Sequence, residues 1–319
     1  MTMPSGKLDQ FKVGTCGYSY PGVPPGGWAG VFYPKIRGRR VDELEFYATY
    51  FDVVEINSTF YRPATPATAQ GWVHRTPEGF EFAVKAWQKF THPKKLGAGD
   101  DASGESWESF DAADVDLFCR GIAPLCEAGK LGPLLFQYPA SFHRDEENLE
   151  ELSQTLAAFE PYRKVVELRH KSWSDRAGET HALLSRSNSA WAYIDEPKFD
   201  SSVRQQLDFR GSIAYLRLHG RNQEKWWRHQ DAWERYDYFY QPDSLRRLGA
   251  GLKQLAAKSP TMKFYIFFNN HARGQAAANA LMLKSEFAED RKVRAPKALV
   301  EAFPDLKNFI GGAGPGASD

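Results

Sequence analysis

The 319-residue chain has little cysteine, little net charge and no long apolar run, and each shortage excludes something. Its three cysteines, Cys16, Cys119 and Cys126, fit no zinc or dithiol spacing, which favours a reducing compartment. A formal charge of +1 excludes a global attraction to nucleic acid or membrane. No stretch approaches the ~18 apolar residues of a membrane span, and the N-terminus has no apolar signal region. We therefore expect a soluble, cytoplasmic protein without membrane contact, and we place Cys119 and Cys126 in its core.

The chain also lacks a glycine-rich phosphate turn. The early segment GTCGYSYPG (14–22) does not fit the pattern G-x-G-x-x-G that an open dinucleotide-binding sheet would usually show. Aromatic residues, in contrast, make up 14% of the chain and hydrophobic residues 42%, which is ample for a large core. Only the tail, GGAGPGASD (311–319), reads as flexible.

Eight short β-branched and aromatic runs alternate with helix-like segments. The runs are 11–17, 53–59, 80–86, 131–139, 164–170, 190–196, 212–220 and 263–270. The predicted helices are 41–51, 65–75, 106–129, 145–159, 179–187, 244–258 and 274–287, while the connection 197–209 gives only a weak helical pattern. Strands this apolar are typical of a parallel sheet covered on both faces. The alternation predicts an α/β fold with a single (β/α)8 barrel over 1–309, a flexible tail over 310–319 and an aromatic-rich insertion after the seventh strand; a doubly wound open sheet is the alternative.

Polar residues gather where these strands end. In VVEIN (53–57), VVELR (165–169) and YLRLH (215–219), two polar residues stand two positions apart, so both point to the same face. Buried charge is costly unless it is paired or reaches a solvated cavity, and the mouth at the carboxyl ends of barrel strands is such a cavity. The predicted mouth residues are Glu55, Asn57, Lys85, Gln137, Glu167, Arg169, His170, Asp195, Arg217, His219, Asn269 and Asn270. A set of structural salt bridges is the alternative for any one of them.

Eight motifs together resemble one known family. They are GTCGYSY (14–20), WAGVFYP (28–34), VVEINSTFYR (53–62), FEFAVKAWQKFTH (80–92), LGPLLFQYP (131–139), VVELRHKSW (165–173), AYLRLHGR (214–221) and YIFFNNHARGQAAANAL (265–281). In this order they resemble the YecE-like family, named for a domain of unknown function, DUF72. The resemblance implies a (β/α)8 barrel but supplies no reaction. At Cys16 the family more often has Ser or Thr, which argues against a catalytic thiol.

The favoured chemistry is metal-free acid/base catalysis on a polar anion such as a phosphorylated sugar or nucleotide. Arg169 and Arg217 offer forked donors for carboxylate or phosphate, and Lys85 adds a point charge. Glu55 or Glu167 is the predicted base, with His219 or His170 relaying protons. The predicted reaction type is hydrolase, lyase or isomerase. A glycosidase pair is a weaker reading, because sequence does not give the carboxylate separation. Asn57, Gln137, Asp195, Asn269 and Asn270 are expected to contact the ligand.

A divalent metal is the first alternative to this chemistry. Glu55, Glu167, Asp195 and His219 form a mixed carboxylate and imidazole set. The cations in the same mouth oppose a metal, and no known metal-binding spacing supports one. No cofactor is otherwise indicated.

The remaining predictions concern aromatic residues near the mouth. Tyr18, Trp28, Tyr61, His92 and Trp173 follow strand ends and are expected to wall the ligand site. The segment 220–241 interleaves bases with Trp and Tyr, which allows a nucleic-acid-binding or phosphodiester-processing protein, although its acids largely cancel the charge. A non-catalytic barrel that senses a small anion is the third reading.

Overall fold

The computed structural model describes residues 10–35, 41–92, 109–288 and 293–311. The predicted flexible tail lies outside this range from residue 312 onwards, as does the beginning of the predicted helix at 106–129. Every other predicted strand and helix falls within the described residues.

Strands form at all eight predicted positions. They are β1 (Phe11–Thr15), β2 (Val53–Ile56), β3 (Glu81–Lys85), β4 (Leu131–Gln137), β5 (Lys164–Glu167), β6 (Ser189–Trp191), β7 (Tyr193–Asp195), β8 (Ile213–Leu218) and β9 (Lys263–Phe268). The sixth predicted strand is therefore divided into β6 and β7. Every pairing is parallel, in two sheets of order β1-β9-β8-β7 and β2-β3-β4-β5-β6. The parallel α/β class predicted from sequence is confirmed.

The two sheets meet at two places but do not form one continuous ladder. Only Ala192 separates β6 from β7, and its N–H donates to the Val166 carbonyl at 2.9 Å. On the other side, β1 and β2 meet through a single parallel bridge between Cys16 and Glu55, where the Gly17 N–H donates to the Glu55 carbonyl at 2.8 Å. The unbroken hydrogen-bonded barrel predicted from sequence is thus not found in the described residues, because β2 and β1 share one bridge rather than a ladder.

The approach of β1 to β2 depends on Gly14. A Cβ atom at this position would lie 2.3 Å from the Val53 carbonyl oxygen and 3.0 Å from the Tyr47 hydroxyl. We expect Gly14→Ala to lower the free energy of unfolding by ~1–3 kcal/mol, as overpacked sites do. Urea denaturation would measure the change. Gly251→Ala is the matched control: no atom lies within 4 Å of its added Cβ, so it should gain ~0.5–1 kcal/mol of helix propensity. Equal behaviour of the two variants would contradict a tight seam.

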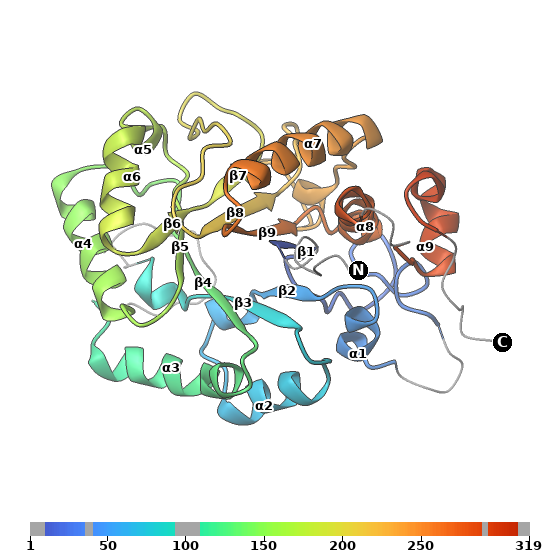
Figure 1. Cartoon of the computed structure of the whole chain (residues 1–319), viewed down its shortest axis with the longest axis horizontal. Helices are drawn as coiled ribbons and strands as arrows, with labels where there is room; N and C mark the ends of the chain where they lie inside the picture. The colour runs from blue at the N-terminus through green and yellow to red at the C-terminus, as the bar shows by residue number, and fades with distance from the viewer. Residues whose placement is uncertain (1–9, 36–40, 93–108, 289–292, 312–319) are drawn as a thin grey trace, which may run out of the picture.

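Helices form a ring around the strands (Figure 1). The predicted helices are observed as α1 (Glu43–Ala48), α2 (Pro66–His74), α3 (Ala112–Glu127), α4 (Glu146–Ala158), α6 (Ala177–Arg186), α7 (Pro242–Lys258) and α8 (Gln275–Phe287). Sequence did not predict α5 (Lys171–Ser174), α9 (Lys297–Ala302) or the short 3-10 turns η2 (Ser58–Phe60), η3 (Gln88–Phe90), η4 (Glu234–Tyr236), η5 (Ala272–Gly274) and η6 (Pro304–Asn308). Side-chain oxygens of Asp42, Thr65, Asp111 and Asp145 cap the first turns of α1 to α4.

Two connections are irregular. No α-helix forms between β7 and β8, where sequence gave only a weak helical pattern. The segment 220–241 after β8 contains only η4, in agreement with the predicted insertion. No helix in the described part of the chain is long and apolar enough to span a membrane.

Strand side chains alternate between two cores. One parity, which includes Val54 and Ile56, packs in the large cluster with the helices. The other parity, which includes Val53, forms a second cluster: Cys16, Val53, Ala83, Leu135, Val165, Ala190, Ala192, Ile213, Tyr215, Tyr265 and Phe267. This inner cluster occupies the space enclosed by the strands, and Glu55 follows Val53 on the same side. The period-two argument from sequence therefore places the polar strand ends correctly.

A charged group centred on Glu81 closes this inner space on the side where the strands begin, opposite the polar residues at the strand ends. The Tyr265 hydroxyl donates to Glu81 Oε2 at 2.7 Å, Lys263 pairs with Glu81, and Lys12 lies 3.6 Å from it. The placement of Cys126 in the core is wrong, because this residue is exposed near the end of α3, whereas Cys119 is half-buried and packs against the core.

Candidate functional site

Arg217 occupies the centre of the predicted mouth and ties two carboxylates together. Its Nε and Nη2 donate to the two oxygens of Glu55 at 3.0 and 2.8 Å, and Nη1 donates to Glu167 Oε2 at 2.6 Å. Nη1 also donates to Gln137 Oε1 at 2.9 Å, and Nη2 lies 3.8 Å from the Cys16 sulfur. Every guanidinium N–H has an acceptor. The predicted role of Arg217 in holding an anion therefore does not fit the structure, because its donors are already used.

Glu55 is equally enclosed. Its side chain has no exposed surface, and Oε2 accepts a further hydrogen bond from the Tyr215 hydroxyl at 2.7 Å. A carboxylate held on both oxygens is a poor general base, so the predicted catalytic role of Glu55 also needs correction. Burial, and next the Glu55 charge, raise the pKa of the Cys16 thiol. Cys16 is thus a buried thiol, as the comparison with the family motif suggested.

Glu167 links the enclosed pair to the more exposed Arg169. Arg169 Nε donates to Glu167 Oε1 at 2.7 Å, and its Nη1 lies 3.6 Å from Glu196 Oε2. Although burial acts to raise the pKa of Glu167, the positive charges of Arg217 and Arg169 outweigh it and hold that pKa well below its usual range. Glu167 is therefore ionised at neutral pH and is too weak a base for the predicted role. Burial raises the pKa of Glu196, which sequence did not single out.

His219 joins the same group from β8. Its Nδ1 lies 2.9 Å from Asn269 Nδ2, and its Nε2 lies 3.8 Å from Glu167 Oε2 without a hydrogen-bond partner in the described residues. Burial, opposed by Glu167, lowers the pKa of His219 to about 4. A neutral imidazole held by Asn269 can therefore present Nε2 to a ligand or to Glu167.

Lys85 is the unusual member of the cluster. It ends β3, is 9% exposed, and forms no ion pair or hydrogen bond with any described residue. Its Nζ lies instead 3.6 Å from the centre of the Phe60 ring. Burial, followed by the charge of Arg217, lowers the pKa of Lys85 from 10.5 to about 7. Lys85 can thus exist in both protonation states at neutral pH.

Phe60 and His92 form the wall beside Lys85. Their rings meet edge to face with centroids 5.1 Å apart, and the Thr91 hydroxyl lies 2.9 Å from His92 Nδ1. Burial and the neighbouring Lys85 lower the pKa of His92 to about 3, so the ring is neutral. Asn57 stands at the start of the turn that carries Phe60, and its Oδ1 is buried without a partner among the described residues. The turn that begins at Asn57 thus carries Phe60, whose ring contacts both Lys85 and His92.

The prediction that aromatic residues wall the ligand site is wrong for two of them. Trp28 and Trp173 are fully buried, and their indole N–H groups donate to the His271 and Phe142 carbonyls at 2.7 and 2.8 Å. Their indole groups fasten neighbouring loops instead of facing a ligand. Tyr61, in contrast, is 72% exposed, and Tyr18 lines a separate cavity with Asp42 and Arg75.

Three other predicted residues are engaged elsewhere. Asp195 forms a two-pronged pair with Arg221, with both distances 2.7 Å. Asn270 is fully buried and donates to the Tyr238 carbonyl and to Asn279 Oδ1, which fixes the loop after β8, while its own Oδ1 has no hydrogen-bond partner among the described residues. His170 instead caps the short helix α5, where Ser172 N–H donates to its Nδ1 at 3.3 Å.

Sequence reasoning missed several residues of the cluster. Tyr215 stands two positions before Arg217 on β8, so the same alternation could have found it. Glu196 follows the end of β7 directly. Phe60 lies in a turn, and nothing in its sequence signals contact with Lys85.

The donor set does not match the metal-ion alternative. Within the residues that the structure describes, no group of three or more His, Cys, Asp and Glu side chains is arranged to hold a metal ion. Arg217 lies between Glu55 and Glu167, and Asp195 is held by Arg221. A cation would have to displace both arginines.

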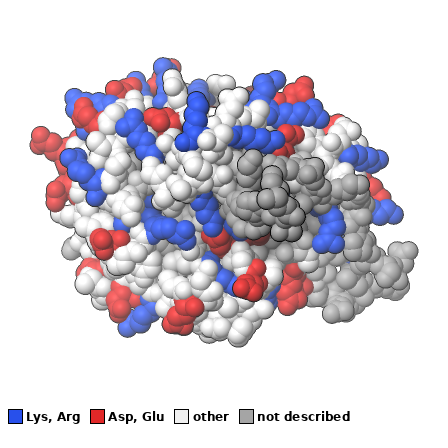
Figure 2. All heavy atoms as spheres, viewed as in Figure 1, with Lys and Arg blue, Asp and Glu red and all other residues white. Residues whose placement is uncertain are grey.

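Charges at the surface are mixed. Figure 2 shows basic and acidic side chains interspersed over one face. In the segment 220–241, Lys225 pairs with Glu234 at 2.9 Å, and Asp237 of the same segment pairs with Arg273 at 3.3 Å. Trp227 is 64% exposed. Paired charges of this kind do not provide the net positive field that a phosphate backbone requires.

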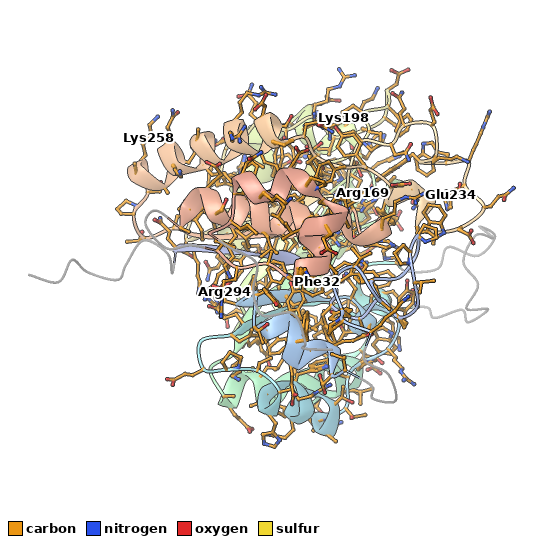
Figure 3. The ribbon with its side chains drawn as sticks, turned by 90° about the vertical axis from the view of Figure 1, so that its right-hand side faces the viewer. Phe32, Arg169, Lys198, Glu234, Lys258 and Arg294 are labelled. Atoms are coloured by element: carbon orange, nitrogen blue, oxygen red, sulfur yellow. The ribbon has the colours of Figure 1, made fainter. Side chains whose placement is uncertain are left out.

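The carboxyl ends of the parallel strands face one side of the molecule. Figure 3 shows Arg169, Lys198 and Glu234 toward one end of the strands, opposite Lys258 at the end of α7. This is the side on which parallel α/β proteins place ligand sites. The candidate site is therefore the group formed by Lys85, Phe60, His92, Glu167, Arg169 and His219.

Comparison with known proteins supports one family. The family model described as "Protein of unknown function DUF72" matches residues 12–302. The chain is 28% identical over 264 residues to UPF0759 protein YunF of Bacillus subtilis, covering 79% of this chain and 89% of that protein. It is 28% identical over 168 residues to UPF0759 protein YecE of Escherichia coli, covering 52% of this chain and 54% of that protein.

Solved structures agree with this assignment. A DUF72 family protein from Thermotoga maritima is 31% identical, with a TM-score of 0.70, over 86% of this chain and 98% of that one. One from Enterococcus faecalis is 21% identical, with a TM-score of 0.71, over 87% of this chain and 95% of that one. The fold, the strand-end motifs and these likenesses together show that the chain belongs to the DUF72 family, also represented by the UPF0759 proteins.

Proposed function

We propose that this protein is a (β/α)8 barrel enzyme that binds a small polar anion and transfers a proton to or from it through Lys85. The observation that carries the proposal is the buried Lys85 amine, which has no hydrogen-bond or ion-pair partner among the described residues and ends β3 at the edge of the sheet that carries the Glu167–Arg169 pair. The barrel is supported by the cyclic order of the strands, by the single-residue gap at Ala192 and by the bridge between Cys16 and Glu55.

Lys85 is suited to acid/base work because its pKa is about 7. A general acid or base is most effective when its pKa lies near the working pH. Burial and neighbouring cations are the physical means by which proteins lower the pKa of a lysine. The carboxylates predicted for this role are instead locked by Arg217, so they serve to hold the cluster together.

Arg169 is the proposed anchor for the anion. Its Nε and Nη1 face Glu167 and Glu196, while Nη2 makes no hydrogen bond within the described part of the chain. Its side chain is 17% exposed, compared with 3% for Arg217. A guanidinium with donors left over is suited to carboxylate or phosphate. His219 Nε2 would contact a hydroxyl or carbonyl group of a phosphorylated sugar or nucleotide, and Asn57 Oδ1 would accept a hydrogen bond from a hydroxyl.

Proton transfer can be tested without knowing the natural substrate. We expect the wild-type chain to bind at least one of pyruvate, dihydroxyacetone phosphate, ribose 5-phosphate and glucose 6-phosphate, and to exchange its C–H protons with D2O or convert it. Proton NMR would report both events. Lys85→Met should slow the reaction by ~10²–10⁴-fold, the usual contribution of a general acid/base group.

Two variants test this role: one separates proton transfer by Lys85 from its positive charge, and the other is a control. Lys85→Arg keeps a positive charge that does not titrate, so it should retain anion binding but lose exchange. Lys89→Met removes a nearby lysine that pairs with Asp114 at 2.7 Å, and the rate should not change. Exchange that survives in Lys85→Met would contradict the proposed role. Tight binding with no turnover in the wild type would favour the sensing barrel over the enzyme.

A further inference from the structure

Of the four buried lysines in the described residues, Lys12 pairs with Asp52 and Glu81, and the other three differ in what surrounds the amine. Lys130 Nζ donates to two carbonyls and to the Thr76 hydroxyl, at 2.7–2.9 Å. Lys164 Nζ donates to three carbonyls, each at 3.2 Å. Lys85 Nζ has the face of Phe60 and no oxygen partner in the described residues. Hydrogen bonds to carbonyls engage the N–H groups of Lys130 and Lys164, whereas the Lys85 nitrogen is free to react.

The surroundings of Lys85 also favour a neutral amine. Burial is the main cause that lowers its pKa, Arg217 and Arg169 act in the same direction, and Glu167 and Glu55 oppose them without restoring the usual value. A desolvated lysine beside another cation is the environment in which amines attack carbonyl carbons. Lys85 ends β3 and Arg169 follows the end of β5, two strands away in the same parallel sheet, so a small ligand bound by Arg169 would lie at the same edge of the sheet as this nitrogen.

We propose that Lys85 forms an imine with the carbonyl carbon of a small ligand that also carries a carboxylate or phosphate. The inference rests on the proposed function, because it places the same anion at the same amine and adds a covalent step. Phe60 would shield the imine from water on one face, and Arg169 would hold the anionic group.

The step balances without a further reactant. The Lys85 nitrogen lone pair forms a bond to the carbonyl carbon, and one N–H proton moves to the former carbonyl oxygen to give a carbinolamine. Loss of that hydroxyl together with the second N–H proton releases water and leaves the C=N bond. Protonation of the imine nitrogen by solvent gives an iminium ion, which withdraws electrons from the neighbouring C–H or C–C bond.

The imine can be trapped by hydride. The full-length chain would be incubated at pH 7 with pyruvate, dihydroxyacetone phosphate or pyridoxal 5′-phosphate, reduced with sodium borohydride, digested and mapped by mass spectrometry. We expect the reduced adduct at Lys85 to exceed that at Lys130, Lys164 or any exposed lysine by a factor on the order of 10², because the neutral amine is far more abundant there. The preferred probe shows whether carboxylate or phosphate is recognised.

Two controls identify the site as the cause. Lactate and glycerol 3-phosphate carry the anion without the carbonyl and should lower the yield by competition, and Lys85→Arg should remove the adduct. Labelling of Lys85 no greater than that of Lys130 would overturn the inference. If proton exchange in D2O persists in that case, Lys85 is a proton carrier only and the proposed function stands. If exchange is absent as well, both proposals are wrong.

Discussion

Arg217→Met will lower the free energy of unfolding by ~3–5 kcal/mol, the usual effect of breaking a buried ion pair by removing one partner. The variant leaves Glu55 and Glu167 buried, 0% exposed, without the three Arg217 N–H donors that now hold them. Met fills similar space, so the loss reports uncompensated charge more than a cavity. Urea denaturation at pH 7 would measure it.

An exposed pair provides the control for this prediction. Arg246 pairs with Asp243 at 2.9 Å on the surface of α7, and Arg246→Met should change stability by no more than ~0.5 kcal/mol. If Arg217→Met does not fold, Tyr215→Phe gives a milder test. It removes one donor to Glu55 and should cost ~1.5–3 kcal/mol, as hydrogen bonds to charged groups do. A loss below ~1 kcal/mol in either variant would contradict a central ionic network.

Lys85→Met will stabilise the protein at neutral pH. The pKa of Lys85 falls from 10.5 in the unfolded chain to about 7 in the fold. Each unit is worth about 1.4 kcal/mol, so the charged lysine costs several kcal/mol, and we expect a gain of at least ~2 kcal/mol on its removal. Between pH 7 and 10.5 the unfolded chain binds more protons than the native one, so wild-type stability rises with pH in this window. The advantage of Lys85→Met should therefore shrink as the pH is raised towards 10.

The variant Lys130→Met tests whether burial of a lysine is by itself enough for its removal to stabilise the protein. Burial lowers the pKa of Lys130 as well, but its amine satisfies two carbonyls and a hydroxyl. Removing it leaves those acceptors without a donor, and we expect a loss of ~1–3 kcal/mol. Denaturation curves of both variants at pH 7 and pH 9 would show opposite signs. If both variants were less stable than the wild type, Lys85 would have a structural partner, and its charge would not lower the stability of the fold.

Alternation within single strands is the part of this protein that sequence predicts well. The spacing of Glu55 from Val53, of Arg217 from Tyr215 and of Glu167 from Val165 fixes which side chains enter the inner space, because the period of a strand is two. The alternation of short apolar runs with helix-like segments likewise predicts the eight strand positions and seven of the helices. It succeeds because each inference depends on a few neighbouring residues.

Pairing between strands is the part that sequence does not give. Nothing in the sequence says that Arg217 meets Glu55 and Glu167 from other strands, so sequence alone predicts that its donors are available for a ligand. Trp28 was assigned to the site because it follows a strand end, although its indole bonds to the loop at His271. The proposed reactive group is therefore Lys85 instead of a carboxylate. Lys85 differs from the carboxylates because it has no hydrogen-bond or ion-pair partner among the described residues.

The most direct test of this account is the titration of Lys85 itself. Carbon-13 NMR of the chain labelled at lysine Cε would follow each amine with pH, and the spectrum of Lys85→Arg would identify the Lys85 signal. The account predicts a midpoint near pH 7 for Lys85, while exposed lysines titrate near ~10.4. A midpoint for Lys85 among those of the exposed lysines would contradict both its acid/base role and the imine.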